Sequence, residues 1–369
     1  MAKKVRVGIL FGGKSAEHEV ALQSAKNIIE AIDRNKYEVV LIGIDKRGHW
    51  HLNESSHYLL NENNPKLIAL NKANTDTVAL VPTDNKTQLV VVREGRMTGT
   101  LDVVFPVLHG PFGEDGTIQG LLKLLGVPFV GADVLGSAVG MDKDVMKRLL
   151  RDAGLPIPKF LVFDLNTRSG IQFRNVVDQL GLPFFVKPAN LGSSVGINKV
   201  SAEADFSFSI DDAFKYDNKI LIEQFIKGRE IECSVLGNYE PISSLPGEVI
   251  PKHDFYSYQA KYIDENGAML EIPAKLPNHL VTQIQYLAIR AFKTLCCWGM
   301  ARVDLFLTPD EQIFINEINT IPGFTRISMY PKLWEATGIS NTELIDRLIQ
   351  LALEKYKTEK KLKSSYDIK

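Results

Sequence analysis

The chain has 369 residues and a formal net charge of −1, with 45% hydrophobic and 24% charged residues. This length predicts two or three domains, because single hydrophobic cores stop growing beyond roughly 250–300 residues. The balanced charge excludes a protein that attracts nucleic acid or an anionic membrane in bulk, and the composition excludes a disordered or fibrous chain.

The N-terminal segment predicts a doubly wound α/β domain. The apolar run 5–11 indicates a buried strand, the glycines after it a turn, and Ser15 the N-cap of a helix with Ile28 on its buried face. A second strand is expected at 37–44, which completes a β-α-β unit.

Neither secretion nor membrane insertion is indicated. Arg6 interrupts the first apolar run, and no stretch approaches the roughly 20 apolar residues of a membrane span. The three cysteines, at 233, 296 and 297, are too few and too irregular for a disulfide framework, which favours a reducing compartment. We therefore expect a cytoplasmic protein with no membrane partner.

Residues 46–98 are polar, with short broken strands between Asn, Asp and Thr clusters, and we interpret them as a variable insertion. Residues 101–108 predict another buried strand, followed by the glycine-rich loop 109–117 and a helix through Leu125. The N-terminal domain is therefore expected to span residues 1–140.

Two further domains are expected. The Gly- and Pro-punctuated connector 154–158 lies near the start of a central domain, for which we expect residues 141–217. A third domain is expected over 218–357, and the Lys-, Glu- and Ser-rich segment 358–369 is interpreted as a solvated tail. The elements predicted in these two domains are strands 159–163, 184–187, 196–200, 219–225 and 230–236, and helices 171–180, 202–214, 276–296 and 341–355.

Residues 8–15 fit the phosphate-binding pattern G-x-x-x-x-G-K-[ST]. That pattern works only where the four intervening residues form a loop around the phosphates. Residues 9–11 are instead expected in a buried strand, so we interpret the match as accidental. The helix N-terminus that follows, with Glu17 in its first turn, can still bind a carboxylate.

A stronger candidate for phosphate binding follows the strand 184–187. Lys187 ends that strand, and the loop 192–196 (Gly-Ser-Ser-Val-Gly) offers backbone N–H groups and hydroxyls beside its ammonium. An ordinary β-turn with an exposed lysine has the same composition, so both interpretations stay open.

The strand–turn–strand segment 219–236 offers groups that suit a nucleoside. Backbone groups of 224–226 could contact the edge of adenine, while Glu223 and Glu230 could accept hydrogen bonds from its amino group and from ribose hydroxyls. Taken alone, a plain hairpin is the better interpretation of this segment.

Residues 300–319 predict a β-hairpin that carries acidic residues on one face. If its turn is centred between residues 310 and 311, Asp304 lies opposite Glu317, because side chains alternate along each strand. Facing carboxylates repel unless a cation lies between them, and oxygen ligands suit Mg²⁺ better than Zn²⁺. A solvated acidic surface is the competing interpretation. The residues expected on this face are Arg302, Asp304, Glu317 and Asn319.

The segment 319–328 follows this hairpin at once. Pro322 and Gly323 build a loop there, in which backbone N–H groups can turn toward an anion. Arg302 would add a fixed cation beside the metal, so the combination indicates a nucleotide-dependent enzyme.

In this order, the motifs resemble those of the ATP-grasp enzymes, and most closely those of the D-alanine–D-alanine ligase family. The resemblance covers about residues 4–355, and the segment 46–98 is similar only to the longer family members. The segments that carry the resemblance are 12–20, 109–120, 140–143, 187–196, 260–262, 301–304 and 317–323.

The resemblance implies a three-domain ATP-grasp architecture with an N-terminal doubly wound domain, and ATP held between the central and C-terminal domains with two Mg²⁺ or Mn²⁺ ions. It implies that ATP phosphorylates the carboxylate of one D-alanine and that the amine of a second D-alanine attacks. The product, D-alanyl-D-alanine, would supply peptidoglycan synthesis. The family also suggests a homodimer, and a lid formed by residues 251–267.

The resemblance further implies roles for single residues. Implied ATP contacts are Lys143, Lys187, Glu223, Gln224, Ile226, Glu230 and Lys261, although family members often have lysine where this chain has Gln224. Implied metal ligands are Asp304, Glu317 and Asn319. Implied substrate and catalytic residues are Glu17 for the first ammonium, His109 beside it, Ser193 orienting Glu17 and Tyr262, Arg302 and the Gly323 N–H for the oxyanion, and Ser328 for the second carboxylate.

Four alternatives follow from these motifs. Within the family, a D-alanine–D-lactate ligase is disfavoured by Tyr262, and another ATP-grasp carboxylate–amine ligase, such as a carboxylase subunit, would lack Glu17 and the loop at His109. A P-loop switch protein would use Lys14 instead. A non-catalytic nucleotide-binding module would need no metal-site carboxylates.

Overall fold

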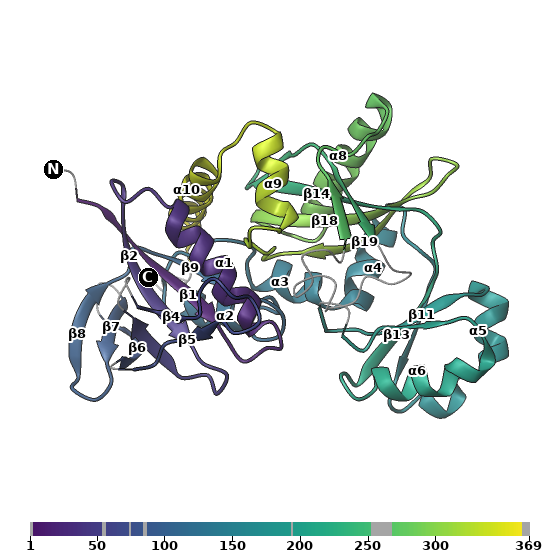
Figure 1. The fold of residues 1–369 in the computed structure, drawn as a ribbon, viewed down its shortest axis with the longest axis horizontal. Helices are drawn as coiled ribbons and strands as arrows, with labels where there is room; N and C mark the ends of the chain where they lie inside the picture. Colours follow the sequence, from purple (N-terminus) through teal and green to yellow (C-terminus); the bar gives the residue numbers. More distant parts are fainter. Residues whose placement is uncertain are drawn as a thin grey trace, which may run out of the picture.

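Three β-sheets of four or more strands, each flanked by helices, form the part of the chain that the computed structural model describes (Figure 1). The described residues are 3–53, 57–73, 75–83, 87–192, 195–251 and 268–363. Within these ranges no helix is both long enough and apolar enough to span a bilayer.

The first sheet confirms the predicted doubly wound start. Strand β1 (Val5–Gly12) pairs in parallel with β2 (Tyr37–Ile44) on one side and with β9 (Val103–Val107) on the other. Helix α1 (His18–Ala31) packs on one face and α2 (Thr117–Leu124) on the opposite face, since they belong to different hydrophobic clusters.

Helix α1 begins two residues later than the predicted cap at Ser15 implies. The helix begins at His18, with Glu17 at the N-cap position and no side-chain cap. Ser15 Oγ accepts from the Glu17 N–H at 3.1 Å, in the turn before the helix. It also donates to the carbonyl of His109 at 2.6 Å, and so joins the loop after β1 to the loop after β9.

The segment 46–98 is part of the first sheet. Its longer strands continue the sheet in the order β8-β7-β6-β3-β2, and Leu89 and Val91 are completely buried against the same cluster as Leu10. A polar sequence hides these strands because only alternate residues face the core. The strands are β3 (Trp50–Asn53), β4 (Leu59–Leu60), β5 (Ala69–Leu70), β6 (Asp76–Pro82), β7 (Thr87–Val91) and β8 (Arg96–Thr100).

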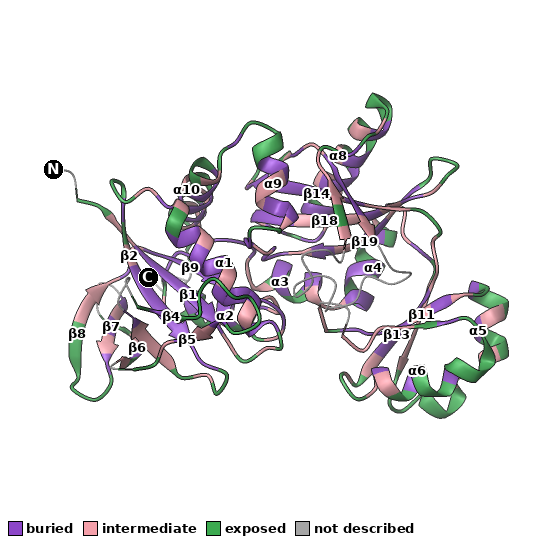
Figure 2. Cartoon of the chain, viewed as in Figure 1, coloured by how far each residue is buried: buried purple, intermediate pink, exposed green. Residues whose placement is uncertain are grey.

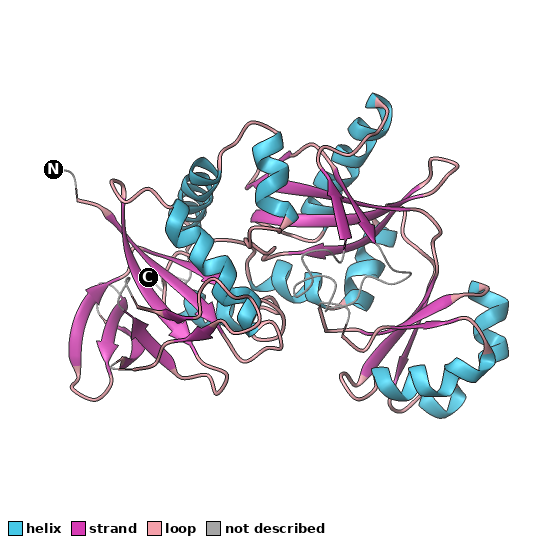
Figure 3. Ribbon diagram, in the orientation of Figure 1, coloured by secondary structure: helices cyan, strands magenta, loops and turns pink. Residues whose placement is uncertain are grey.

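The second sheet is a separate body with helices on one face (Figure 3). Its order is β10-β13-β11-β12, and the rings of Phe173, Phe184 and Phe206 meet within its core. The strands are β10 (Phe160–Asp164), β11 (Phe184–Pro188), β12 (Asn198–Val200) and β13 (Lys219–Gln224). The helices are α5 (Phe173–Leu180) and α6 (Phe206–Ala213), with 3₁₀ turns at Arg168–Gly170 and Glu203–Asp205.

The third sheet has the order β17-β16-β14-β18-β19, with β15 paired to β14. Helix α8 packs on it, and so do α3 and α4, whose Val139 and Met146, respectively, lie in the same cluster as Leu305. The strands are β14 (Arg229–Gly237), β15 (Ile242–Ser243), β16 (Gly247–Pro251), β17 (Ala268–Glu271), β18 (Gly299–Leu307) and β19 (Ile313–Asn319). The helices are α3 (Val134–Met141), α4 (Lys143–Asp152) and α8 (Asn278–Thr294).

These sheets suggest different domain limits from those expected. β13 pairs with β10 and β11 in the second sheet, although the expected boundary at 217/218 assigns it to the third domain. Residues 141–152, expected in the central domain, pack with the third sheet. We therefore propose a central domain of about residues 160–224.

The first and third sheets share one hydrophobic cluster. Helices α9 (Met329–Ala336) and α10 (Asn341–Glu359) contribute Trp334 and Leu348, which pack with Phe105 of β9. Buried residues lie on both sides of this junction, whereas α5 and α6 bury only the faces that pack on the second sheet (Figure 2). The junction fixes the loops after β1 and β9 against the loop after β19.

Candidate active site

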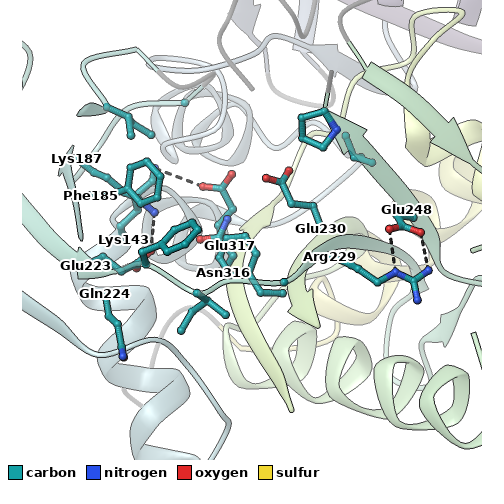
Figure 4. A pocket seen from close by; sticks show the side chains of 18 of the residues that line it. Lys143, Phe185, Lys187, Glu223, Gln224, Arg229, Glu230, Glu248, Asn316 and Glu317 are labelled. Atoms are coloured by element: carbon teal, nitrogen blue, oxygen red, sulfur yellow. Dashed lines mark hydrogen bonds and ion pairs between the residues drawn. The ribbon is translucent and has the colours of Figure 1, made fainter. Parts of the chain in front are cut away.

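A cavity of about 380 Å³ lies between the second and third sheets (Figure 4). The cavity brings together residues that are far apart in the sequence. They include Lys143 at the start of α4, Lys187 near the end of β11 and Glu317 on β19. Seven of the predicted ATP or metal residues line it: Lys143, Lys187, Glu223, Gln224, Ile226, Glu230 and Glu317. Its apolar walls, which the sequence did not single out, include Phe185, Leu191, Ile197, Phe225, Val249, Ile250 and Phe306.

The predicted residues differ in how they face this cavity. Glu230 and Glu317 point into the same region, whereas the side chain of Gln224 extends away from them (Figure 4). Lys143 donates to the carbonyl of Leu191 at 2.6 Å and lies 3.7 Å from Glu317 Oε2. Its ammonium therefore joins the loop after β11 to β19.

A buried ion-pair network lies at the inner end of the cavity. Glu223 accepts from Lys187 Nζ at 2.6 Å through Oε1, and its Oε2 lies 2.5 Å from Nζ of Lys147. Burial alone would raise the pKa of Glu223, but the two ammonium groups overcome it and lower that pKa. Lys147 was not predicted, although it follows Lys143 by four residues and so lies on the same helix face.

The hairpin of β18 and β19 has the predicted pairing. Arg302 lies opposite Asn319, and Asp304 opposite Glu317. The turn, however, is centred on Asp310, because Leu307 pairs with Ile313 and Leu305 with Ile315. A β-bulge at Asn316 adds one residue and restores the predicted register at Glu317.

A guanidinium already lies beside the acidic pair. Arg302 contacts Asp304 through two bonds of 2.7 Å, and its Nε lies 2.8 Å from Glu232 Oε2. Asn319 donates its amide to Asp304 at 3.0 Å, which leaves the amide oxygen for another partner. Glu232 was not predicted, because nothing in β14 distinguishes it from a surface acid.

The chemistry of these side chains fits a hard cation. Two carboxylates and an amide oxygen are ligands that Mg²⁺ accepts, and Mg²⁺ usually completes its shell with water and phosphate oxygens. Within the described ranges, no group of three or more His, Cys, Asp and Glu side chains could hold a metal ion by itself. The residues therefore suit a metal that arrives with a phosphate ligand, not a closed structural site.

The loop after β19 leaves one N–H available. Ile321 donates to Glu114 Oε1 at 3.1 Å, Phe324 to Ser24 Oγ at 3.1 Å, and Thr325 to Ser328 Oγ at 2.9 Å. Pro322 has no N–H. Among the residues that the structure describes, the Gly323 N–H has no acceptor, although Gly323 is only partly exposed. An unpaired donor of this kind can bind an anion.

His109 holds this loop in place. Its Nδ1 donates to the carbonyl of Ile321 at 3.0 Å, which fixes the tautomer, and its Nε2 accepts from Ser24 at 3.1 Å. Burial lowers the pKa of His109 to about 4, and the positive charge of Arg302 adds to this effect. The neutral ring therefore contacts protein groups through both nitrogens.

Two carboxyl groups lie near this clamp. Glu114 accepts from the Gly110 N–H at 2.8 Å and, as above, from the loop after β19. Burial, and then the neighbouring Glu17, raise the pKa of Glu114. Glu17 is itself buried, and a methyl group built on Gly110 or Gly192 would come within 2.6 or 3.3 Å of its Oε2. Its carboxylate thus lies between the loops after β9 and β11.

The remaining predicted site residues have different outcomes. Ser328 lies beside Gly323, since a methyl group on that glycine would be 2.8 Å from its hydroxyl. Ser193, Lys261 and Tyr262 lie outside the described residues, and so does the expected lid 251–267 except for its first residue, which ends β16. Lys14 is exposed, with its ammonium 5.7 Å from the centre of the Phe112 ring, and residues 8–12 continue β1. That strand confirms the rejection of the P-loop pattern.

Replacing His109 with asparagine is expected to remove one source of acid sensitivity. Asn keeps a donor near the position of Nδ1 but does not titrate. Because the folded pKa of about 4 lies below the unfolded value of about 6.5, the unfolded chain binds more protons between these pH values. The free energy of unfolding of wild type should therefore fall by on the order of 2 kcal/mol relative to that of the variant as pH falls from 7 to 4.5.

Urea unfolding of both proteins at the two pH values measures this difference. The same replacement at the exposed His279 is the control for the exchange of histidine for asparagine. A pH dependence that is the same in wild type and in the His109 variant would show that His109 titrates normally in the folded protein.

Known proteins resemble this chain over nearly its whole length. The family model described as D-ala D-ala ligase N-terminus matches residues 6–132, and the one described as D-ala D-ala ligase C-terminus matches 149–350. A D-alanine–D-alanine ligase of Shouchella clausii is 59% identical over 365 residues, which is 99% of both chains.

Solved structures are similar as well. A D-alanine–D-alanine ligase of Coxiella burnetii superposes with a TM-score of 0.86 at 39% identity, covering 98% of this chain and 97% of its own. The VanG D-Ala:D-Ser ligase of Enterococcus faecalis superposes with a TM-score of 0.83 at 35% identity, covering 95% of this chain and 100% of its own.

Proposed function

The chain belongs to the D-alanine–D-alanine ligase family of ATP-grasp enzymes, and on that premise we propose which of its residues carry each step. It is a ligase that joins two D-alanines at the expense of ATP. ATP phosphorylates the carboxylate of the first, and the amine of the second displaces phosphate to give D-alanyl-D-alanine, ADP and phosphate. The dipeptide supplies peptidoglycan synthesis.

We propose that the cavity between the second and third sheets binds ATP. Its volume, about 380 Å³, and its apolar walls suit a nucleobase and ribose. The ammonium groups of Lys143 and Lys187 supply the positive charge that phosphates require. Gln224 and Ile226 would contribute backbone groups at the adenine edge, and Glu230 a carboxylate for the ribose hydroxyls. Lys261, which lies outside the described residues, would also bind the phosphates.

We propose that Asp304, Glu317 and Asn319 hold two Mg²⁺ ions, or Mn²⁺ in their place, together with the phosphates. The ions supply neutralisation of the charge that develops on the transferring phosphoryl group. Support comes from the facing register of the two carboxylates and from the oxygen of Asn319, which its amide contact to Asp304 leaves available. Arg302 now neutralises Asp304 and would have to share it.

We propose that Glu17 binds the ammonium of the first D-alanine. A buried carboxylate with a second acid beside it favours a cation strongly. Attack by the second amine places negative charge on the carbonyl oxygen, and the Gly323 N–H and Arg302 would stabilise that oxyanion. Ser328 would hold the second carboxylate. Since both nitrogens of His109 contact protein groups, we propose that it acts by positioning the loop that carries Gly323.

The choice of D-alanine as the second substrate rests on the proposed role of Tyr262 with Ser193. A relative of the same fold is named as a D-Ala:D-Ser ligase, so the fold alone does not determine the second substrate. D-lactate carries a hydroxyl group where D-alanine carries an amine. We expect replacement of Tyr262 to shift the preference of the enzyme toward such hydroxy acids.

One observation carries the assignment of the site: seven predicted residues from separate parts of the sequence line a single cavity. The test is release of ADP with and without D-alanine, with the product identified by mass. We expect ADP release to depend on D-alanine and not on L-alanine, and the mass to be that of the dipeptide. ADP release that is independent of any amino acid would overturn the proposed reaction.

Lys187 should matter far more than Lys14 for nucleotide binding. Lys187 lines the cavity, whereas Lys14 follows β1 and lines a different pocket, together with Trp50 and Phe112. Loss of one phosphate-binding ammonium typically costs about tenfold or more in affinity, by analogy with charged hydrogen bonds of about 1.5–3 kcal/mol. Calorimetric titration of ADP into the two alanine variants measures it, and equal losses would restore the P-loop interpretation.

We also propose a cytoplasmic homodimer, as the family suggests. Light scattering coupled to size exclusion tests the oligomer, and a mass of one chain at micromolar concentration would contradict the dimer.

A further inference from the structure

A single buried ammonium contacts both the nucleotide pocket and the strand that carries the metal ligands. Nζ of Lys147 lies 2.5 Å from Glu223 Oε2 and donates to the carbonyl of Asn316 at 3.1 Å. The side chain is only 1% exposed. Lys147 comes from α4, Glu223 from β13 of the second sheet, and Asn316 from β19 of the third.

The Asn316 contact falls on the β-bulge. In an unbroken strand, Ile313, Ile315 and residue 317 would face the same side, which is the buried side. The pairing of Asp304 with Glu317 but of Leu305 with Ile315 makes Asn316 the extra residue. The bulge therefore turns Glu317 out of the core and toward the cavity, where it lies beside Asp304.

The Glu223 contact determines how Lys187 is held. Glu223 has one oxygen on Lys147 and the other on Lys187, at 2.5 and 2.6 Å. Without Lys147, Lys187 would be the remaining ion-pair partner of the buried Glu223 carboxylate. The stronger attraction to Glu223 would then draw the Lys187 ammonium away from phosphate. Buried ion pairs contribute little to stability compared with apolar packing, because desolvation offsets their attraction. A role in stability alone therefore does not explain Lys147.

We propose that Lys147 is a positioning residue that couples nucleotide binding to the metal site. Its ammonium anchors the bulge that presents Glu317 and, through Glu223, fixes the position of Lys187. Lys143, one turn earlier on α4, lies 3.7 Å from Glu317 itself, so the helix acts on both the backbone and the side chain of β19. This inference rests on the proposed ATP and metal site and adds a residue that touches neither ligand.

The experiment compares Lys147→Met with Lys355→Met. Lys355 is a matched control, because it is also a buried lysine in an ion pair, 3.2 Å from Asp133 Oδ2, but it lies on α10 away from the cavity. The probes are ADP with Mg²⁺, followed by calorimetry, and Mn²⁺ at saturating ADP, followed by electron paramagnetic resonance.

Lys147→Met should raise both dissociation constants by about tenfold or more, as loss of residues that orient metal ligands usually does. Lys355→Met should leave both within about twofold. Equal affinities in the two variants would overturn the proposal.

A double variant separates the two contacts and avoids an unbalanced buried charge. In Lys147→Met with Glu223→Gln, Mn²⁺ affinity should remain low, because the bulge still lacks its anchor. Wild-type Mn²⁺ affinity in the double variant would overturn the coupling. These binding measurements do not require turnover. If wild type bound ADP but made no dipeptide, the proposed reaction would be contradicted. The affinities of the variants would still decide the role of Lys147.

Discussion

Glu317→Gln is expected to lower turnover by about a thousandfold while the protein stays folded. The substitution removes a negative oxygen from the proposed metal site, and metal ions contribute several kcal/mol of charge stabilisation in phosphoryl transfer. The folded state should tolerate it, because Glu317 is partly exposed and its ion pair with Lys143 spans 3.7 Å. ADP release at saturating ATP, Mg²⁺ and D-alanine measures turnover, and the thermal midpoint reports the fold.

Glu311→Gln is the matched control for this variant. Glu311 belongs to the turn of the same hairpin and is exposed, and within the described part of the chain its carboxylate pairs with His279, at 3.1 Å. Its replacement should leave both turnover and thermal midpoint unchanged. Near-normal turnover of Glu317→Gln at low Mg²⁺ would remove Glu317 from the metal site, and with it the interpretation of the acidic hairpin.

Regular strands were predictable from local pattern, whereas the sheet that each segment joins was not. The second strand, β2, has the predicted bounds, because its apolar run ends sharply at both sides. In contrast, α4 and β13 join sheets other than those expected. The sequences of α4 and β13 are compatible with packing on either the second or the third sheet. Which sheet each one joins depends on the hydrophobic surface that buries Met146 or Ile222 in the folded protein.

In the acidic hairpin, the pairing of Asp304 with Glu317 was predicted correctly, although the β-bulge was not predicted. The predicted turn centre is half a residue away from the observed one, and the bulge at Asn316 compensates for it. The sequence holds a signal for the bulge: isoleucines occur at 313 and 315 but then at 318, which breaks the two-residue period of a strand. That break places Asn316 and Glu317 on the cavity side in succession.

The residues that the sequence argument missed are those that act through other residues. Lys147, Glu114 and Glu232 resemble ordinary charged residues of a helix, a loop and a strand. Their importance comes from burial and from partners distant in sequence, such as Asn316, Ile321 and Arg302. Residues that would touch a ligand directly, in contrast, occur next to glycines or at strand ends, where a single sequence can reveal them.

Arg302→Lys is expected to lower dipeptide synthesis by about a hundred- to a thousandfold, with little effect on ATP binding. Removal of one oxyanion donor typically has this cost. Lysine keeps the charge, but one ammonium cannot reproduce the two bonds to Asp304 and the contact to Glu232. Arg302 does not line the nucleotide cavity, so the dissociation constant of ADP should stay within about threefold of wild type.

The two chemical steps can be separated in this variant. Exchange of the β,γ-bridging oxygen of isotopically labelled ATP reports formation of D-alanyl phosphate, whereas dipeptide formation also requires the attack of the second amine. Because the oxyanion forms only during that attack, Arg302→Lys should keep most of the exchange and lose the dipeptide. Arg347→Lys is the control, since this arginine also contacts a carboxylate, that of Glu343, but on α10. Parallel loss of exchange and dipeptide would instead assign Arg302 to phosphoryl transfer, with the oxyanion left to Gly323.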